Sequence, residues 1–446
     1  MLGARRVQYS AWAGEEYALR APPRTAGHTQ AESVIDVNLD PSLPVGQRIK
    51  LLRERRGLSR AVVAGLCGRS ESWLKKIEQG TRQAVRLPTL LRLAEVLRIN
   101  DLTELTGQQL PLAVYGKPTH EATPTVQQAL TSYSLSATAG GEKVGPPSTS
   151  ELRRRLEDAF TLWRTSRYPR AEVGALLPAL LIDAQYAVRE LNGPDCRTAY
   201  AALAGVYHLA QKLLAYQPVP ELGFLAADLG MLAAQEADDP EAIAASAWYL
   251  AHVFREAGHL DQADRVVRDA ATLLNPLSDN VTAEQLAMWG SLQLATGLTA
   301  ACDYDFGTAW RFWDTADETA RKLDPEYWHP WNGFGQVDMQ VYGVSIDVTL
   351  GRHKDAARRF EAIDVTSIRS ASERSRHLVE MARGYAGRRD DIAAVHLLLK
   401  AQQESPEMVK HGRFGRSIIR ELRERGHSAV KSEVGALAEQ VELPMS

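Results

Sequence analysis

The sequence predicts an all-α protein with two helical regions joined by a linker. Apolar residues recur at helical spacing through residues 44–107 and again from residue 151 to the end, whereas the alternation typical of β-strands is almost absent. A stretch rich in Gly, Pro, Ser and Thr separates the two regions. A chain of 446 residues is also too long for one ordinary hydrophobic core.

These patterns divide the chain into four segments. Residues 1–43 show little periodicity and predict a mostly disordered arm. Residues 44–107 form a first helical domain, and residues 151–446 form a second one. Residues 108–150 between them predict a flexible linker, with room for one short helix near 126–133.

The composition is that of a folded, water-soluble protein. Hydrophobic residues make up 45% of the chain, and no apolar run approaches the roughly 18 residues that a membrane span needs. The first twenty residues lack the apolar core of a secretory signal, so we expect a cytoplasmic protein. Cys67, Cys196 and Cys302 lie far apart without metal-ligand spacing, which favours buried thiols in a reducing compartment.

Positive charge is concentrated in the first helical domain. Residues 44–107 carry 13 Lys and Arg against 6 Asp and Glu, a net charge of +7. The whole chain has a net charge of −3, so the remainder carries −10. A compact basic segment on an acidic body indicates binding to a polyanion.

The first domain begins with three short helices separated by tight turns. We expect them over residues 44–56, 60–67 and 71–79. Ser59 and Ser70 have the chemistry of N-caps for the second and third helix. Gly57, Gly68 and Gly80 suit the turns that follow each helix.

The third helix is predicted to have one apolar and one polar face. Leu74 and Ile77 are three residues apart and point to the core. The opposite side carries a stripe at positions i, i+3, i+4 and i+7, formed by Ser72, Lys75, Lys76 and Gln79. Ammonium groups bind phosphates, and hydroxyl and amide groups bind base edges, so this stripe suits the major groove of DNA.

Residues 45–105 resemble the helix-turn-helix domains of the Cro/C1 (xenobiotic-response-element) family. The resemblance rests on Arg48, Leu52-Arg53, Arg56-Gly57-Leu58-Ser59, Ala64, Gly68, Ser70, Leu74, Ile77-Glu78 and Gly80. It continues through Leu90–Leu97, which is similar to the family's closing helix, so that the domain is expected to have about five helices. The resemblance implies that Ser72, Trp73, Lys75 and Lys76 approach DNA.

One position departs from the family pattern. Arg60 stands where the family usually has Gln, and Arg favours phosphate or guanine edges. Arg82 and Arg86 follow the third helix as phosphate clamps or as ordinary loop arginines, whereas Glu78 is expected to brace the arginines of the first helix. The candidate DNA-binding residues are Arg60, Ser70, Ser72, Trp73, Lys75, Lys76, Gln79, Arg82 and Arg86.

The second domain contains degenerate internal repeats. Gly258-His259-Leu260-Asp261-Gln262-Ala263 is similar to Gly351-Arg352-His353-Lys354-Asp355-Ala356 and, less closely, to Gly387-Arg388-Arg389-Asp390-Asp391-Ile392. A small–large–small spacing recurs at Ala263, Val267 and Ala270, at Ala309, Trp313 and Ala316, and at Ala356, Phe360 and Ile363. These patterns resemble tetratricopeptide repeats, which implies a curved solenoid of paired helices with a concave binding face.

Aromatic residues are concentrated between Asp303 and Asp347, which hold 10 of the chain's 31 aromatic side chains. A cleft lined by rings and carboxylates suits a peptide or an amphiphilic small molecule. The candidate ligand-binding residues are Tyr304, Trp310, Trp313, Trp328, Trp331, Asp338 and Tyr342. The alternative is that these rings fill the core between the repeat helices.

The sequence contains no pattern that indicates catalysis, a bound metal or a cofactor. The histidines are scattered, and HExxH, GxSxG and phosphate-loop motifs are absent. We therefore expect no enzyme activity, no metal site and no cofactor.

The combined features predict a sequence-specific transcriptional regulator. Its domain order resembles that of quorum-sensing and antibiotic-pathway regulators of bacteria. We expect double-stranded DNA and a peptide or small-molecule effector as partners, and a homodimer on a pseudo-palindromic site. The alternative is an adaptor whose repeat domain binds a partner protein while the first domain localises it on DNA.

Overall fold

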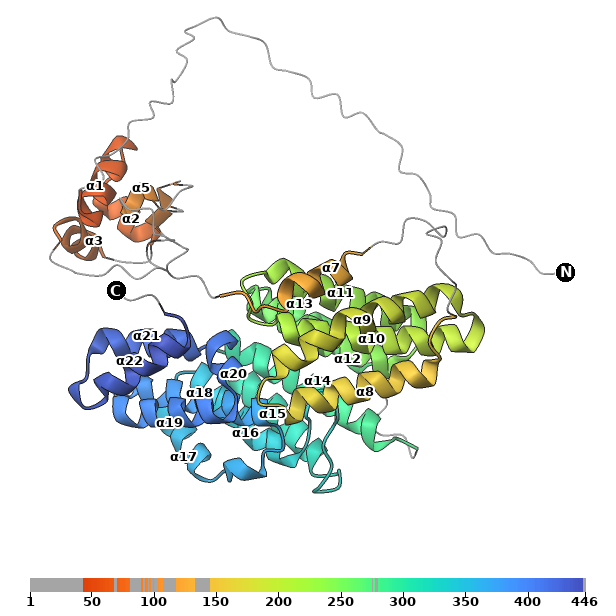
Figure 1. The fold of residues 1–446 in the computed structure, drawn as a ribbon. Coiled ribbons are helices and arrows are strands. Elements are labelled where there is room, and N and C mark those ends of the chain that lie inside the picture. The colour runs from red at the N-terminus through yellow and green to blue at the C-terminus, as the bar shows by residue number, and fades with distance from the viewer. Residues whose placement is uncertain are drawn as a thin grey trace, which may run out of the picture. The chain divides into compact units, whose positions relative to one another are not determined.

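The computed structural model describes residues 43–67, 70–80, 90, 93–94, 96–97, 99, 103–106, 118–132, 145–274, 276 and 280–443. The chain divides into two compact units, residues 1–112 and 113–446. Throughout the described residues, all regular secondary structure is helical, in agreement with the predicted all-α class (Figure 1). The arm expected over residues 1–43 lies outside the described residues except for Leu43.

The first unit has the predicted succession of three short helices, followed by one further turn of helix. These elements are α1 (Val45–Arg55), α2 (Arg60–Leu66), α3 (Glu71–Glu78) and α5 (Thr103–Thr106). The Ser59 hydroxyl accepts a hydrogen bond from Val62 N at 3.2 Å, and the Ser70 hydroxyl accepts one from Trp73 N at 3.3 Å. Both predicted N-caps are therefore confirmed.

The turns of the first unit also follow the sequence prediction. Gly57 and Gly80 have φ angles of 64° and 70°, in the left-handed region that glycine adopts without strain. Gly68 lies outside the described residues. The core of this unit gathers one face of each helix with described residues of the predicted closing segment: Ile49, Leu52, Val63, Ala64, Leu74, Ile77, Leu93, Ala94, Leu97, Ile99 and Leu105.

The second unit is a succession of antiparallel helical hairpins, as the resemblance to tetratricopeptide repeats implied. Its longer helices are α8 (Thr149–Thr165), α9 (Pro169–Glu190), α10 (Gly193–Leu214), α11 (Pro220–Ala237), α12 (Pro240–Glu256), α13 (Leu260–Ala271), α14 (Ala283–Cys302), α15 (Phe306–Ala320), α16 (Gln336–Thr349), α17 (His353–Glu361), α18 (Ala371–Gly387) and α19 (Asp391–Glu404). Shorter helices complete it, namely α7 (Thr123–Leu130), α20 (Pro406–His411), α21 (Gly415–Arg425) and α22 (Lys431–Gln440).

The hairpins pack on one another through their first helices. α10 contacts α12, α12 contacts α14, α14 contacts α16, and α16 contacts α18. The second helices α11, α13, α15, α17 and α19 each pack against the first helix of their own hairpin. This arrangement produces a helical-repeat solenoid with one row of inner helices and one row of outer helices (Figure 1).

The structure corrects the register of the repeats. In the hairpins that begin with α12, α14, α16 and α18, the turn contains a residue with positive φ, and five positions later a fully buried alanine lies in the second helix. The turn residues are Gly258, Tyr304, Gly351 and Arg389, and the alanines are Ala263, Ala309, Ala356 and Ala394. The last repeat therefore aligns on Arg389 and not on Gly387, which ends α18 and contacts His353.

The corrected register reveals a fourth copy of the small–large–small spacing. Ala394, Leu398 and Ala401 are all fully buried in α19. This copy is hard to recognise in the sequence because Arg389 occupies a turn position where two other repeats have glycine. When a residue other than glycine adopts a positive φ, the residue type does not reveal the turn in the sequence.

The expected linker over residues 108–150 is interrupted by an ordered helix of the second unit. α7 buries Val126, Ala129 and Leu130 in the same core cluster as α8, α9 and α10. The short helix that the sequence allowed near 126–133 is thus present three residues earlier, with an apolar face of three side chains. Apart from residues 118–132 and 145–150, this stretch lies outside the described residues.

α9 is long and apolar enough to cross a membrane by length and composition. Its apolar side is nevertheless used inside the protein, where Val173, Leu177, Leu180 and Leu181 are buried in the core of the second unit. Arg170, in the first turn of this helix, is also buried. The features of α9 are therefore those of a core helix.

The two ends of the solenoid meet. The Glu407 carboxylate on α20 accepts hydrogen bonds from the backbone N–H groups of Arg170 at 2.6 Å and Ala171 at 3.1 Å. Tyr168, the N-cap of α9, supplies no side-chain bond of its own. Ser405 donates a hydrogen bond to the Arg167 carbonyl, and α18 packs against α8. Glu407 thus caps α9 from the far end of the chain and closes the row of helices.

Candidate nucleic-acid interface and repeat-domain cavity

α3 has the polarity that the sequence predicted. Leu74, Ile77 and Glu78 are buried, and the whole predicted stripe of Ser72, Lys75, Lys76 and Gln79 is exposed. Trp73 is half-buried and packs against the core of the first unit. One side of α3 therefore exposes two ammonium groups, a hydroxyl and an amide. The opposite side packs into the core and fixes the position of the helix.

A buried ion network fixes the position of α3. Arg53 of α1 donates to both oxygens of Glu78, at 2.6 and 3.1 Å, and also to the Leu58 carbonyl at 2.9 Å. Arg60 of α2 donates from Nε to Glu78 at 2.6 Å. The Glu78 side chain is 1% exposed and that of Arg53 is 7% exposed. One carboxylate therefore joins α1, α2 and α3, which confirms the expected bracing role of Glu78.

The network keeps Glu78 ionised. Burial alone raises the pKa of Glu78, but the hydrogen bonds from Arg53 and Arg60 outweigh burial and hold the pKa below its usual value. The carboxylate is therefore charged at neutral pH. Its negative charge is enclosed by two guanidinium groups, so it does not oppose an approaching phosphate.

The remaining predicted DNA-binding residues have different surroundings. Arg60 is half-buried against Glu78, a structural role that the sequence analysis did not assign to it. The Ser70 hydroxyl is used as the N-cap of α3. Arg82 and Arg86 lie outside the described residues. The stripe and Trp73 thus lie together on α3, and Arg60 lies beside Glu78 at the C-terminal end of this helix.

Gly46 is a residue of this unit that the sequence analysis missed. A Cβ atom at Gly46 would lie 2.1 Å from the backbone oxygen of Ile77, so α1 and α3 approach each other too closely for any other residue. The backbone of Gly46 is ordinary helix, and nothing in the local sequence marks this requirement.

We expect Gly46→Ala to destabilise the first unit by about 3 kcal/mol, because the clash is with backbone that cannot rotate away. The matched control is Gly65→Ala in α2, where a Cβ meets nothing within 4 Å. That change should instead stabilise the helix by about 0.5–1 kcal/mol. Hydrogen exchange of the α1–α3 amides in the full chain measures both effects. Equal protection in the two variants would contradict the close-packing account.

The predicted ring residues do not form one cleft. Trp313 is buried, donates from Nε1 to the Met339 carbonyl at 2.9 Å, and packs with Trp310 in a core cluster. Trp331 stacks on Phe160 between two core clusters. Most of these rings therefore fill the spaces between helices, which was the alternative interpretation.

The other predicted ligand residues are also dispersed. Tyr304 is 75% exposed in the turn after α14. Trp328 lies under the guanidinium group of Arg164. Asp338 is buried, and burial raises its pKa well above the usual value, which favours the neutral acid. Of the predicted set, Tyr342 lines an enclosed space in this unit, and Trp331 lines a second, separate one. The first of these carries most of the charged side chains of interest.

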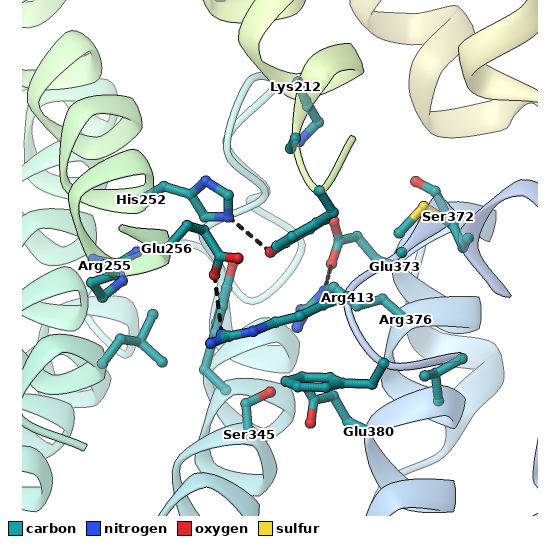
Figure 2. A pocket seen from close by; sticks show the side chains of 18 of the residues that line it. Lys212, His252, Arg255, Glu256, Ser345, Ser372, Glu373, Arg376, Glu380 and Arg413 are labelled. Atoms are coloured by element: carbon teal, nitrogen blue, oxygen red, sulfur yellow. Dashed lines mark hydrogen bonds and ion pairs between the residues drawn. The ribbon is translucent and has the colours of Figure 1, made fainter. Parts of the chain in front are cut away.

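That space is a cavity of about 200 Å³ on the inner side of the solenoid. The inner helices α10, α12, α14, α16 and α18 contribute to its wall, together with Trp163 of α8, Arg170 of α9 and residues 408–414. Within the described residues, no group of three or more His, Cys, Asp or Glu side chains is arranged to hold a metal ion. The cavity wall instead contains four arginines, one lysine and several aromatic side chains. Figure 2 labels most of its charged side chains.

Comparison with known proteins supports the assignment of the first unit. A family described as "Helix-turn-helix domain" matches residues 44–105. The chain therefore contains a helix-turn-helix domain, and α2 and α3 are its two characteristic helices. A search of curated proteins found no match to the chain.

Two solved structures are similar to longer parts of the chain. One is Bacillus thuringiensis PlcR in complex with the peptide PapR7 and DNA, with 12% identity, coverage of 79% of this chain and 98% of that chain, and a TM-score of 0.27. The other is ComR from S. thermophilus in complex with DNA and its signalling peptide ComS, with 16% identity, coverage of 69% and 99%, and a TM-score of 0.14. These scores are too low to transfer the partners of either protein to this chain.

Proposed function

We propose that this chain, which carries a helix-turn-helix domain over residues 44–105, is a cytoplasmic, sequence-specific DNA-binding regulator of transcription. The observation that carries the proposal is the exposed stripe of Ser72, Lys75, Lys76 and Gln79 on α3. Lysine ammonium groups bind phosphates, and the hydroxyl and amide groups have the donors and acceptors that read base edges. Trp73 and Arg60 flank this stripe, and Ser70 fixes its first turn.

The regulator acts as a homodimer in this proposal. One recognition helix reads only a few base pairs, and two-fold related helices separated by one turn of DNA read a pseudo-palindrome. The second unit supplies the pairing surface and also the control. A peptide or small-molecule ligand that prefers one dimer geometry changes the separation of the two α3 helices and hence the affinity for DNA.

We expect Lys75→Ala combined with Lys76→Ala to weaken DNA binding about 10- to 100-fold, because two phosphate contacts are lost. The slope of log affinity against log salt concentration should fall by about 2, whereas the preferred sequence stays the same. Ser72→Ala should have the converse effect and relax the sequence preference. Fluorescence anisotropy with duplexes selected from a random library measures all three properties.

The control for this experiment is Lys50→Ala, which removes an exposed lysine of α1 outside the stripe. Equal losses in Lys50→Ala and in the double variant would indicate general electrostatic attraction without a specific role for α3. An unchanged affinity in the double variant would rule out α3 as the DNA-binding helix. Copurification of a partner protein without any ligand effect on DNA affinity would favour the adaptor function.

A further inference from the structure

The wall of the inner cavity carries more positive than negative charge. Its five cationic side chains are Arg170, Lys212, Arg255, Arg376 and Arg413. Its three carboxylates are Glu256, Glu373 and Glu380. Figure 2 shows charged side chains from α10, α12, α18 and the segment before α21 converging on this space. The hydrogen bonds and ion pairs of these eight side chains determine which of the charged groups a ligand can bind.

Two of the cations are neutralised by carboxylates of the wall. Arg376 pairs with Glu373 at 2.6 Å, and Arg413 pairs with Glu256 at 3.2 Å. The third carboxylate, Glu380, lies 3.6 Å from Arg383, which is not part of the wall. Burial raises the pKa of Glu380, so it contributes less negative charge than an exposed glutamate would.

Two further cations are occupied by neutral acceptors. Arg170 donates to the carbonyls of Leu213 and Ala215 at 3.3 and 3.4 Å and to the Met408 sulfur at 3.3 Å. Arg255 donates to the Ala295 carbonyl and the Thr299 hydroxyl, both at 3.4 Å. These hydrogen bonds occupy part of each guanidinium group and fix its position in the wall, and both groups keep their positive charge.

Lys212 differs from the other four cations. Among the described residues, its ammonium group has no hydrogen bond and no ion pair, and it lies 5.9 Å from the centre of the Trp163 ring. Its half-buried side chain lines the cavity. Burial lowers the pKa of Lys212, and Glu373, which acts against this effect, is already paired with Arg376. An unpaired ammonium group in such a place destabilises the fold until an anion joins it.

The histidine beside Lys212 is not a second anion-binding group. His252 accepts or donates through Nδ1 with Gln211 at 3.1 Å and through Nε2 with Tyr216 at 2.8 Å. Burial lowers its pKa to about 3, so the ring is neutral at physiological pH. It serves to hold Gln211 and Tyr216 in the wall. Among the described residues, Lys212 is therefore the cation of the wall that has neither a hydrogen bond nor an ion pair, and one carboxylate can pair with it.

The rest of the wall is suited to an apolar body. Trp248 and Tyr342 contact each other edge to face at 6.3 Å, and Tyr249 and Phe414 extend the aromatic surface. Trp163 lies on the side of Lys212. Rings that are fixed by the helices present flat apolar surfaces at low entropic cost to a ligand.

We propose that this cavity binds a small organic acid whose single carboxylate pairs with Lys212 and whose apolar or aromatic body lies against Trp163, Trp248 and Tyr249. The inference rests on the proposed function, since it identifies the class of ligand that controls the regulator. A single ammonium group without a partner suits one carboxylate, whereas a phosphate is bound best by several donors directed at it. The shape and volume of the cavity limit the ligand to a compact molecule.

The test compares carboxylates with matched neutral amides on the full chain. Acetate, butyrate, phenylacetate and indole-3-acetate are each paired with the corresponding amide at equal ionic strength. Thermal unfolding of the second unit is followed by scanning calorimetry, which the fluorescence and absorbance of the indole acid do not disturb. We expect the carboxylates to raise Tm above their amides, by an amount that increases from acetate to the aromatic acids.

The decisive variant is Lys212→Met, which keeps the length of the side chain and removes its charge. The difference between acid and amide should disappear in this variant, and its Tm without ligand should exceed that of the unchanged protein. The control is Lys354→Met on the outer helix α17, where the lysine is exposed. In that variant the difference between acid and amide should persist.

Each other outcome overturns the proposal. The absence of any acid–amide difference in the unchanged protein would exclude a carboxylate site, as would a difference that survives in Lys212→Met. Stronger stabilisation by inorganic phosphate than by every carboxylate would assign the cavity to a different anion. Fluorescence anisotropy with DNA in the same solutions tests separately whether the acid binds and whether it controls DNA binding. Binding of acids at Lys212 without any change in DNA affinity would support the carboxylate site and contradict ligand control.

Discussion

Glu78→Ala is expected to unfold the helix-turn-helix unit and abolish DNA binding while the helical-repeat unit stays folded. The change leaves Arg53 buried without its carboxylate, and breaking a buried ion pair from one side costs about 3–5 kcal/mol. A unit of about 60 residues has a total stability of roughly 3–9 kcal/mol. The loss is therefore comparable with the whole stability of the unit.

Hydrogen exchange of α1–α3 in the full chain, together with the Tm of the second unit, measures this effect. Glu71→Ala is the matched control, because Glu71 is an exposed acid in the first turn of the same helix. It should cost less than about 1 kcal/mol. Adding Arg53→Met to Glu78→Ala should recover part of the stability, since the orphaned charge is removed. A double variant less stable than Glu78→Ala would show that Arg53 acts mainly through packing.

The same ion network determines how the first unit responds to acid. The pKa of Glu78 in the folded chain lies below its value in the unfolded chain, because Arg53 and Arg60 favour the ionised form. Its contribution is therefore complete above the unfolded pKa and disappears as the pH falls through the folded pKa. The difference in stability between Glu78→Ala and the unchanged protein should shrink over that acidic range and be constant at neutral pH.

Glu407→Ala is expected to destabilise the second unit by about 3 kcal/mol. Two backbone N–H groups at the start of α9 lose a charged acceptor at 2.6 and 3.1 Å, and each buried unsatisfied donor costs about 1–3 kcal/mol. For a unit of this size the loss corresponds to a decrease in Tm of roughly 4 °C. Scanning calorimetry of the full chain resolves this change.

Two further variants test the cause of this decrease. Glu407→Gln keeps one oxygen acceptor without the charge and should lose about half as much stability, since charge-assisted bonds are about twice as strong as neutral ones. Glu424→Ala removes an exposed acid of α21 and should leave Tm within about 1 °C. If Glu424→Ala were as damaging as Glu407→Ala, the net charge of the unit and not the cap of α9 would explain the effect.

The sequence predicted those features that depend on neighbours along the chain. The N-caps Ser59 and Ser70, the turn glycines Gly57 and Gly80, and the two faces of α3 all follow from spacing within one or two helical turns. Each of these is set by hydrogen bonding or periodicity between residues a few positions apart, which a single sequence displays directly.

Features created by distant parts of the chain could not be predicted in this way. Gly46 is required because Ile77 lies against it, and Glu407 acts as a helix cap because α9 begins beside it. Nothing in the sequence around Lys212 distinguishes it from an ordinary surface lysine. It lines the cavity because helices from distant parts of the chain surround it. The role of the aromatic cluster stayed open for the same reason, since periodicity does not distinguish rings that fill a core from rings that line a cleft.

The cap on α9 also has a consequence for how the chain folds as it is synthesised. An ordinary solenoid can add one repeat after another, because each repeat contacts only its neighbours. Here the amides at the start of α9 bond to a carboxylate that lies 237 residues further along the chain. The start of α9 therefore acquires its cap only after residue 407 has been synthesised, whereas the core shared by α7 to α12 can form from residues made earlier.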